Sequence, residues 1–426
     1  MPANPRFTRA YAAVNIGSFR VSCMILGQDD SGALQVLGSS HRKAEGVKRG
    51  YVTDMAAASD AIRQAVEKAE TTARTTIASV TIGCAGAGLS SKVASVEIAI
   101  GGRRIEEDDI DHLLAAARDM LQPDGRMVLH AQPAHYTLDG AHGVANPKGL
   151  HAETLGVDIH VVMAEGAPVR NLIEAVQNAH LDVDAVVASP LASAYACLSA
   201  EERDLGVALI EIGAQVTNVS VHAGGMLLGL KSIPIGSNDI TDALASSLGI
   251  RRGQAERLKC VSGSAIATPS DHREMVPVGG PGEEHVLPLA RGADEQNRIA
   301  RAELVGVVTE RLSYLASEVG KCLKTLGFSG SSAGQVVLTG GGAELHGIAE
   351  FMQGSLGRAV RVGKPPQIAG LPEAHATPGF ATLVGLCLYA ADDPVDIRAV
   401  ESRTATVRIK GLGAVTRVFQ AVRDYF

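Results

Sequence analysis

Apolar and polar positions along the chain follow a plan that occurs twice. Near the N-terminus, the run YAAVNIGSFRVSCMIL predicts a strand, a tight turn at Gly17-Ser18 and a second strand. In the middle of the chain, LGVALIEIGAQVTNVSVHAGGML predicts the same kind of hairpin, with Gly213 at its turn. The two turn glycines lie 196 residues apart, so the repeating unit has the size of a domain.

Each hairpin is followed later by a predicted amphipathic helix and by a strand that ends in glycines. In the first half these are DMAAASDAIRQAVEKAE and VTIGCAGAG, and in the second half RAELVGVVTERLSYLASEVGKCLKTLG and QVVLTGGGAELHGI. The second of these helices starts at about Ala302, and its apolar residues Leu304, Val308 and Leu312 recur at helical spacing. The pattern therefore predicts an α/β protein made of two halves with one architecture.

Further segments interrupt and extend the two halves. An acidic helix, EEDDIDHLLAAARDML, and several strands fill residues 90–165 and predict a subdomain inserted in the first half. Residues 240–300 predict a second inserted subdomain, in which a stretch rich in Pro, Gly and charge (267–291) is typical of a surface loop. We therefore expect the first half over 1–89, 166–204 and 365–391, the second half over 205–239 and 301–364, a linker over 392–413 and a terminal helix over 414–426.

Composition narrows the class of protein. A chain of 426 residues is too long for one ordinary core. The six cysteines are scattered singly, which favours buried thiols in a reducing cytosol over a zinc site or disulfides. A net charge of −7 without a basic block in the body of the chain argues against nucleic-acid binding. No signal-peptide layout and no run near the roughly 20 apolar residues of a membrane span are visible, so we expect a cytoplasmic protein.

Three glycine turns at strand ends are candidate sites of chemistry. They are Gly17-Ser18, Gly213-Ala214-Gln215 and Gly340-Gly341-Gly342. Backbone N–H groups approach a phosphate closely only where no Cβ intrudes, and the start of a helix nearby adds a favourable dipole. Tight turns also use glycine for purely structural reasons. Three such turns at matching positions in a duplicated fold nevertheless favour one shared ligand that carries phosphates.

These segments resemble the superfamily of actin, sugar kinases and heat-shock chaperones, and within it the FtsA family of bacterial division proteins. VVLTGGGAELHGI is similar to the adenosine motif of that family, and LASAYACLSAEERDLGVALIEIG to its connecting helix and second phosphate hairpin. IPIGSNDITDALASSLGI, AERLK, HRKAEGVKRGYVTD and AVRVGKPPQIAGL also resemble family segments. The resemblance spans about Tyr11 to Phe426. It implies a duplicated actin-like ATPase fold, with two halves around a nucleotide cleft, an inserted subdomain in each half and a C-terminal amphipathic helix.

The resemblance also implies a ligand, ATP or ADP with Mg²⁺, and a set of contact residues. Glu256 and Lys259 would contact the ribose or the base edge, although their spacing of three on a predicted helix equally suits a solvated surface ion pair. The implied nucleotide contacts are Asn15, Gly17, Ser18, Glu211, Gly213, Ala214, Gln215, Gly236, Glu256, Lys259, Gly340, Gly341 and Gly342.

Several residues depart from the pattern of the superfamily ATPases. Those enzymes normally have Asp in the strand just before each phosphate glycine, where it organises hydrated Mg²⁺ and the attacking water. Here Asn15 and Glu211 stand at these positions, and Glu211 would contact Mg²⁺ only through a bound water molecule. In the connecting helix, Ser189 stands before Pro190 where filament-forming relatives have Glu. The resemblance therefore implies nucleotide binding with at most slow ATP hydrolysis.

The last residues predict an amphipathic helix. Apolar residues over 414–426 recur at helical spacing and share an arc of about 120°. From residue 402 onward there are five Lys or Arg against one acidic residue, a net charge of +4 that anionic lipid would attract. The segment is too short to span a bilayer, and it suits either the membrane interface or docking on the protein's own core. The expected membrane contacts are Val415, Arg417, Val418, Phe419, Val422, Arg423 and Phe426.

The FtsA resemblance implies a structural adaptor of the bacterial division machinery. Such a protein binds ATP, associates with itself and tethers FtsZ filaments to the cytoplasmic face of the inner membrane at the division site. Its implied partners are FtsZ, further copies of the chain, other divisome proteins and an anionic membrane surface, and no nucleic acid. Two alternatives remain: an ATPase enzyme of the actin fold, which an Asp before Gly17 and Gly213 would have favoured, and the related adaptor of type IV pilus assembly.

Overall fold

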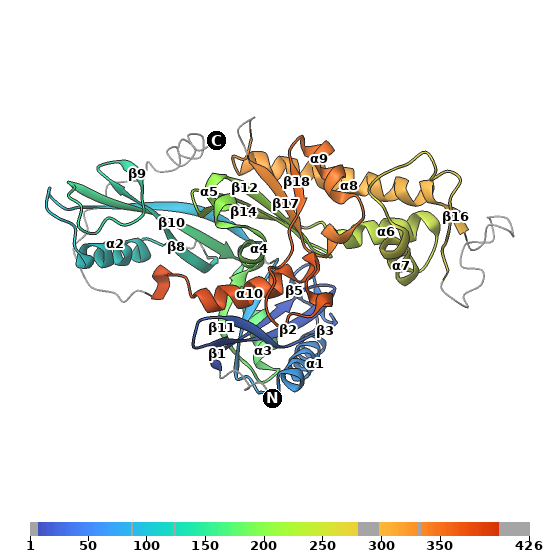
Figure 1. The fold of residues 1–426 in the computed structure, drawn as a ribbon, viewed down its shortest axis with the longest axis horizontal. Helices are drawn as coiled ribbons and strands as arrows, with labels where there is room; N and C mark the ends of the chain where they lie inside the picture. Colours follow the sequence, from blue (N-terminus) through green and yellow to red (C-terminus); the bar gives the residue numbers. More distant parts are fainter. Residues whose placement is uncertain (1–6, 87, 122–124, 280–297, 330–333, 400–426) are drawn as a thin grey trace.

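The computed structural model of the chain describes residues 7–86, 88–121, 125–279, 298–329 and 334–399. The predicted terminal helix (414–426) and most of the predicted linker lie outside these residues, as do residues 280–297 of the predicted surface loop. The described elements form two large sheets and two short two-stranded ones, with helices packed on and between the large sheets (Figure 1).

The first half is built on a five-stranded sheet in the order β11-β6-β1-β2-β3. β1 pairs antiparallel with β2 and parallel with β6, which in turn pairs parallel with β11. Helix α1 begins after Asp54, whose carboxylate accepts the N–H of Ala57 at 3.1 Å and so caps the helix. The elements of this half are β1 (Phe7–Ile16), β2 (Arg20–Asp29), β3 (Leu34–Lys43), β4 (Val47–Lys48), β5 (Tyr51–Val52), α1 (Met55–Ala73), β6 (Ser79–Cys84), α3 (Gly166–Gln177), β11 (Asp182–Ala188), α4 (Ser189–Cys197) and α10 (Ala381–Asp392).

The second half repeats this connection pattern. Its strands lie in the order β18-β17-β12-β13-β14, with β12 antiparallel to β13 and parallel to β17. β12 and β13 are buried along their whole length, because central strands of such a sheet are covered on both faces. The matching order confirms the predicted duplication. The elements are α5 (Ala200–Leu205), β12 (Val207–Ile212), β13 (Thr217–Ala223), β14 (Met226–Ile233), α8 (Arg301–Thr325), β17 (Gln335–Thr339), the 3-10 turn η2 (Gly341–Glu344), α9 (Ile348–Leu356) and β18 (Val360–Val362).

The subdomain inserted in the first half lies beside the second half. Its strands continue the second sheet to nine strands in the order β14-β7-β10-β8-β9. The junction is short, because only Lys231 of β14 and Ser90 of β7 pair there, supported by a 2.8 Å hydrogen bond from the N–H of Leu230 to the hydroxyl of Ser91. The subdomain has its own apolar core and extends to one end of the molecule (Figure 1). Its elements are β7 (Ser90–Ala99), α2 (Glu107–Asp119), β8 (Met127–Leu138), β9 (Ala141–Val144) and β10 (Thr154–Ala164).

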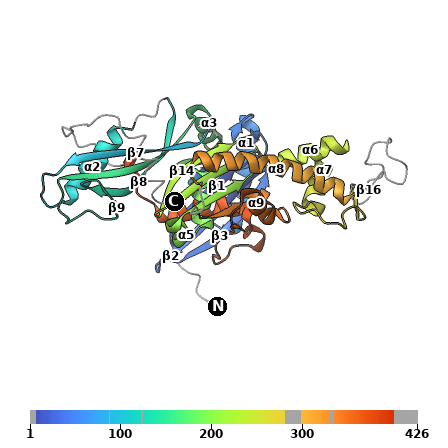
Figure 2. The same ribbon diagram turned by 90° about the horizontal axis from the view of Figure 1, so that it is seen from above.

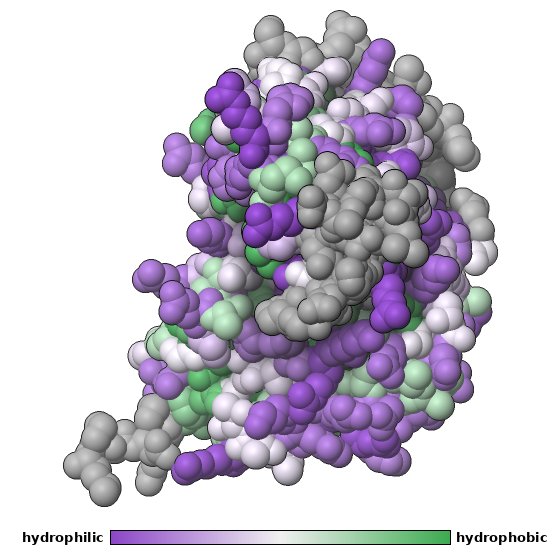
Figure 3. Space-filling model, turned by 90° about the vertical axis from the view of Figure 1, so that its right-hand side faces the viewer, coloured by the Kyte–Doolittle hydropathy of each residue, from purple (hydrophilic) through white to green (hydrophobic). Residues whose placement is uncertain are grey.

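The second insertion occupies the opposite end of the elongated molecule (Figures 1 and 2). It contains α6 (Ser237–Leu248), α7 (Arg252–Ser262) and the short paired strands β15 (Met275–Pro277) and β16 (Arg298–Ala300). Seen from this end, the surface is largely hydrophilic with small separated apolar areas (Figure 3). Within the residues described, no helix is both long and apolar enough to cross a bilayer.

Two helices lie between the sheets and join the halves. α4 follows the last strand of the first sheet and packs against α10, which returns from the second half late in the chain (Figure 1). The hydroxyls of Ser193 in α4 and Thr382 in α10 lie 2.9 Å apart in the buried interface. Ala194 and Ala381 of the same helices pack with Leu209 and Val337 of the second sheet. This contact fixes the floor of the cleft between the halves.

The start of the predicted linker is held on the inserted subdomain. Ile397 is fully buried in the core of that subdomain. On either side of it, the Asp396 carboxylate accepts the N–H of Ala131 at 3.2 Å, and Arg398 donates to the carbonyl of Val128 at 3.0 Å. These bonds occupy the edge of β8 that β9 leaves unpaired. The chain therefore stays attached for several residues beyond α10, where the sequence predicted a linker.

Three buried histidines, His130 in β8, His160 in β10 and His222 in β13, should make the fold sensitive to acid. Burial lowers the pKa of His130 to about 3, of His160 to about 4 and of His222 to about 3. Because the unfolded chain titrates near pH 6.5, it binds more protons than the folded chain below that pH. The contribution of these histidines to the free energy of unfolding is largest above pH 6.5, and it is lost as the pH falls from there to their folded-state pKa values of about 3 to 4. Between pH 7.5 and 5.5 we expect each histidine to lower the unfolding free energy by about 1.4 kcal/mol.

Denaturant unfolding of the wild type and of His160→Gln at both pH values measures this effect. The variant should lose about 1.4 kcal/mol of the change in unfolding free energy between the two pH values, whatever its stability at pH 7.5, because His160 no longer takes up a proton on unfolding. An identical pH dependence in the two proteins would contradict the assignment of His160 as a neutral buried group.

Candidate nucleotide-binding cleft

A cavity of about 460 Å³ lies between the two halves. Its volume falls in the range of pockets that hold small-molecule ligands. Residues from both phosphate hairpins, the start of α6, α7, α8 and the turn η2 line it. Every residue that the sequence predicted as a nucleotide contact lies on its wall: Asn15, Gly17, Ser18, Glu211, Gly213, Ala214, Gln215, Gly236, Glu256, Lys259, Gly340, Gly341 and Gly342.

The two predicted phosphate turns share one geometry. The N–H of Gly17 donates to the carbonyl of Arg20 at 3.0 Å, and the N–H of Gly213 donates to that of Val216 at 2.9 Å. A Cβ at Gly213 would lie 2.7 Å from the Val216 oxygen, closer than real Cβ contacts allow. Glycine at this position therefore lets the turn close tightly, and the turns face each other across the cavity.

The three glycines of the third turn differ in how closely other atoms surround them. Gly340 has a φ of +84°, and a Cβ there would lie 2.5 Å from the carbonyl oxygen of Ile212. A Cβ at Gly342 would lie 2.3 Å from the Ile212 side chain. At Gly341, between them, a Cβ would meet no atom within 4 Å. Gly340 and Gly342 are thus required by the protein's own packing, whereas Gly341 leaves room beside the cavity.

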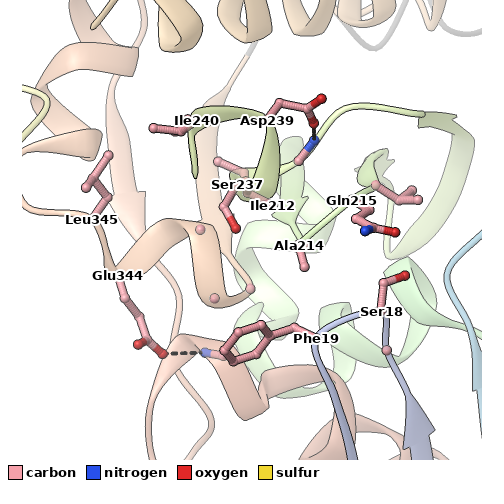
Figure 4. Close-up of a pocket in the computed structure, with 18 of the residues that line it drawn as sticks. Ser18, Phe19, Ile212, Ala214, Gln215, Ser237, Asp239, Ile240, Glu344 and Leu345 are labelled. Carbon is pink, nitrogen blue, oxygen red and sulfur yellow. Dashed lines mark hydrogen bonds between the residues drawn. The ribbon is translucent and has the colours of Figure 1, made fainter. Parts of the chain in front are cut away.

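The start of α6 is tied to the second phosphate turn. The N–H groups of Ser237 and Asn238 donate to the carbonyls of Gly213 and Ala214 at 2.9 and 2.7 Å. A Cβ at Gly236 would lie 2.5 Å from Ala214, so only glycine allows this approach. The carboxylate of Asp239 accepts the N–H of Gly236 at 2.8 Å (Figure 4). The helix start and the turn therefore form one rigid wall of the cavity.

The acid before the second turn is held by neighbouring side chains. One oxygen of Glu211 accepts the amide of Asn218 at 2.9 Å, and the other accepts the hydroxyl of Thr382. Burial raises the pKa of Glu211, although these two hydrogen bonds act in the opposite direction. Ser189 is fully buried, and its hydroxyl has no hydrogen-bond partner among the described residues. Near the first turn, the side chain present is the neutral amide of Asn15.

The Glu256–Lys259 pair is enclosed and does not fit the solvated surface pair that the sequence left open. The two side chains are 26% and 9% exposed, with Nζ and Oε2 2.8 Å apart. Lys259 also donates to the hydroxyl of Thr241 at 2.8 Å and to the carbonyl of Ser237 at 3.1 Å. These three bonds use the three donors of the ammonium group. The Glu256 carboxylate, by contrast, keeps capacity to accept hydrogen bonds from hydroxyls of a ligand.

Other lining residues were not identified from the sequence. Phe19 is 52% exposed, and its ring extends from the first hairpin toward Glu344 (Figure 4). The guanidinium of Arg20 lies 3.8 Å above the ring of Phe380 and donates to the carbonyl of Gly379. Phe19 and Arg20 directly follow Gly17-Ser18, and this position in the sequence could have indicated that they line the cavity. Tyr314 of α8 also lines the cavity, but nothing in the sequence indicated it, because exposed residues are common on amphipathic helices.

Cys260 of α7 places a thiol in the cavity that a reagent can modify. It lines the cavity and is exposed, so the prediction of buried thiols is wrong for Cys260 and confirmed for the other five cysteines. Burial of its sulfur and the nearby Glu256 raise the pKa of the Cys260 thiol. We therefore expect a disulfide reagent such as DTNB to modify one thiol per folded chain, and faster at pH 9 than at pH 7. Cys260→Ser should remove this reaction, and an unchanged reaction in that variant would contradict the assignment.

Among the described residues, no group of three or more His, Cys, Asp or Glu side chains is arranged to hold a metal ion. Glu211, the sequence-predicted indirect contact of Mg²⁺, lines the cavity with both oxygens already hydrogen-bonded. The sequence-predicted membrane contacts, Val415 to Phe426, lie outside the described residues.

Comparison with known sequences finds two family matches in this chain. A profile described as "Cell division protein FtsA" matches residues 208–385, and one described as "SHS2 domain inserted in FTSA" matches residues 86–163. The cell division protein FtsA of Agrobacterium fabrum is 33% identical and covers 100% of this chain and 97% of its own length. FtsA of Escherichia coli K12 is 27% identical over 93% of this chain and 94% of its own length.

Solved structures share the fold. A PilM–PilN type IV pilus biogenesis complex matches with a TM-score of 0.63 and 18% identity, over 89% of this chain and 98% of the matched chain. MreB 5 of Spiroplasma citri, crystallised with AMPPNP, matches with a TM-score of 0.54 and 11% identity, over 91% of this chain and 98% of its own. These likenesses confirm the predicted actin-like architecture.

Proposed function

Because this chain belongs to the FtsA family of cell division proteins, we propose that it is a nucleotide-binding adaptor that tethers FtsZ filaments to the cytoplasmic face of the inner membrane. The nucleotide-binding part of this proposal rests on the cavity between the halves, because every predicted contact residue lines it. ATP or ADP is the proposed ligand. FtsZ, other divisome proteins, further copies of this chain and an anionic membrane are its proposed partners.

The residues of the cavity fit a nucleotide. The turns at Gly17 and Gly213 line opposite sides of the cavity, where the backbone N–H groups that follow each glycine would suit phosphates. Open space beside Gly341 leaves room for the ligand at the adenosine motif. The Glu256 carboxylate would accept from ribose hydroxyls, while Lys259 holds it in place. Arg20 supplies a positive charge on the first-half wall.

The same cavity is poorly equipped for hydrolysis. Mg²⁺ would be held mainly by the phosphates of the nucleotide, with Glu211 touching it only through bound water. Each Glu211 oxygen already accepts one hydrogen bond, from Asn218 or Thr382, which uses part of the acceptor capacity of this acid and holds its carboxylate in one orientation. Asn15 cannot accept a proton at neutral pH, and Ser189 offers a hydroxyl where a carboxylate would be needed. We therefore propose that the nucleotide acts mainly as a structural ligand.

ATP turnover should accordingly be slow or undetectable. An ordinary enzyme turns over at roughly 10 s⁻¹, and we expect this protein to remain at least about 100-fold below that rate in a phosphate-release assay. Asn15→Asp should strengthen the dependence of binding on Mg²⁺, because it restores a carboxylate near the metal's expected position. Sustained turnover near 10 s⁻¹ by the wild type would favour the ATPase enzyme over the adaptor.

Membrane attachment is proposed for the C-terminal segment. The amphipathic residues 414–426, with a net charge of +4 from residue 402 onward, suit an anionic membrane interface. The segment is short, so stable attachment requires several copies, which self-association of the chain would supply. The buried Ile397 anchors the chain on the inserted subdomain before this segment begins.

A pilus adaptor is the second candidate function. The likeness to the PilM–PilN complex favours it as far as the fold is concerned, but at 18% identity the fold is all that the two share. The relatives that match over nearly the full chain at 27% and 33% identity are division proteins. Recruitment of FtsZ to vesicles separates the two candidates, because a pilus adaptor would leave FtsZ in solution.

A further inference from the structure

A small hairpin of the first half touches both predicted phosphate turns. β4 and β5 pair through Val47 with Val52 and Lys48 with Tyr51, which leaves Arg49-Gly50 as the two-residue tip. The N–H of Arg49 donates to the side-chain oxygen of Gln215 at 2.8 Å, and the N–H of Gly50 lies 3.4 Å from the hydroxyl of Ser18. Gly50 also lines the cavity. The tip therefore forms part of the cavity wall, at the end where the two predicted phosphate turns lie.

The backbone of the tip is built for this position. Both tip residues have positive φ, +51° at Arg49 and +79° at Gly50, as a type I′ hairpin turn requires. Arginine is an unfavourable residue for that conformation, where asparagine or glycine would fit with less strain. A Cβ at Gly50 would lie 2.7 Å from the Cα of Gly86, so the tip is pressed against the end of the first sheet. The tip is thus seated firmly on the first half.

Gln215 reaches the tip from the other half. Its side chain and that of Ser18 lie on facing sides of the cavity (Figure 4). The Arg49–Gln215 bond therefore spans the two halves, whereas the bond to Ser18 stays within the first half. Any opening that separates the hairpin tip from the second turn must break the Arg49–Gln215 bond.

We propose that the Arg49–Gln215 hydrogen bond is a clasp that closes the phosphate end of the cleft and slows the release of a bound nucleotide. This inference rests on the proposed nucleotide site and adds a residue, Arg49, that acts through its backbone N–H. Gln215 has the positioning role, because its side chain fixes the second turn to the first half. One hydrogen bond between neutral groups is a weak restraint, so the clasp opens readily and tunes the rate of exchange.

Stopped-flow release of N-methylanthraniloyl-ATP, chased with excess ATP, tests the clasp in the full chain. Gln215→Ala removes the acceptor and should speed release about fivefold. Gly50→Ala displaces the tip by its clash with Gly86 and should have a similar effect. The double variant should release no faster than either single variant, because both remove the same bond. Arg49→Asn keeps the N–H in a residue suited to the turn, and should release at the wild-type rate.

A second readout needs no nucleotide. The Arg49 amide should exchange its hydrogen with solvent faster in Gln215→Ala than in the wild type, as followed by site-resolved hydrogen exchange. Equal release rates in wild type and Gln215→Ala, additive effects in the double variant, or a rate change in Arg49→Asn as large as that in Gln215→Ala would overturn the clasp. If the wild type binds no nucleotide, the proposed function fails, and unchanged exchange of the Arg49 amide in Gln215→Ala then refutes the bond itself.

Discussion

Replacing Gly341 by aspartate should reduce ATP affinity at least about 100-fold, a loss of about 2.7 kcal/mol. The Cβ of the new residue fits without strain, because no protein atom lies within 4 Å of its position. The side chain instead takes the space left for the ligand, and its negative charge lies near a polyanionic nucleotide. Calorimetric titration with ATP and Mg²⁺ measures the change, and the thermal unfolding midpoint should stay near that of the wild type.

Gly354→Asp is the matched control. Gly354 lies in α9, is exposed and does not line the cavity, and a Cβ added there would likewise meet no atom within 4 Å. The control adds the same side chain and charge to the same half of the protein, and its ATP affinity should equal that of the wild type. If Gly341→Asp binds ATP as tightly as this control, the nucleotide does not occupy the space beside the third turn.

Removal of residues 414–426 should abolish membrane attachment. Burial of Phe419 in the interface contributes roughly 1.5–3 kcal/mol, so even Phe419→Glu should weaken vesicle binding of a single chain at least about tenfold. In a filament the loss is repeated at every subunit, and attachment should fail almost completely. The truncated protein should still fold and bind nucleotide, because the described cores and the cavity are built from residues that precede the removed segment.

Co-sedimentation with anionic vesicles at low and high salt measures this loss. The wild type should pellet with the vesicles, and less at high salt because its basic residues are screened. Arg417→Lys, which keeps the charge, serves as the control and should pellet like the wild type. If the truncated protein pellets as well as the wild type, residues 414–426 are not the membrane anchor.

The sequence predicted those parts of the fold that leave a local signal. The hairpins at Gly17 and Gly213, and the glycines after β17, were visible because a tight turn between apolar strands requires special residues. Their convergence in one cavity follows from the duplicated strand order. The long apolar period of α8 was visible for the same reason, since its buried face repeats over many turns.

Features that depend on a single tertiary contact were not predictable. Ile397 stands between Val395 and Ala399 in a short segment with charged neighbours, and nothing in that segment shows that Ile397 completes the core of the inserted subdomain while Val395 stays exposed. The burial of Lys259 comes from Thr241 and Ser237 on another helix, which spacing along α7 cannot reveal. The hydrogen bond between Arg49 and Gln215 joins residues far apart in the chain, and neither lies in a pattern that indicates the other.

The most direct test of the proposed tether is sedimentation of FtsZ with anionic vesicles and ATP, in the presence and absence of this protein. FtsZ alone should stay in the supernatant, and the wild-type protein should carry it into the vesicle pellet. The chain lacking residues 414–426 should bind FtsZ but leave it in solution, because only the membrane contact is lost. FtsZ that remains in the supernatant with the membrane-bound wild type would contradict the adaptor function.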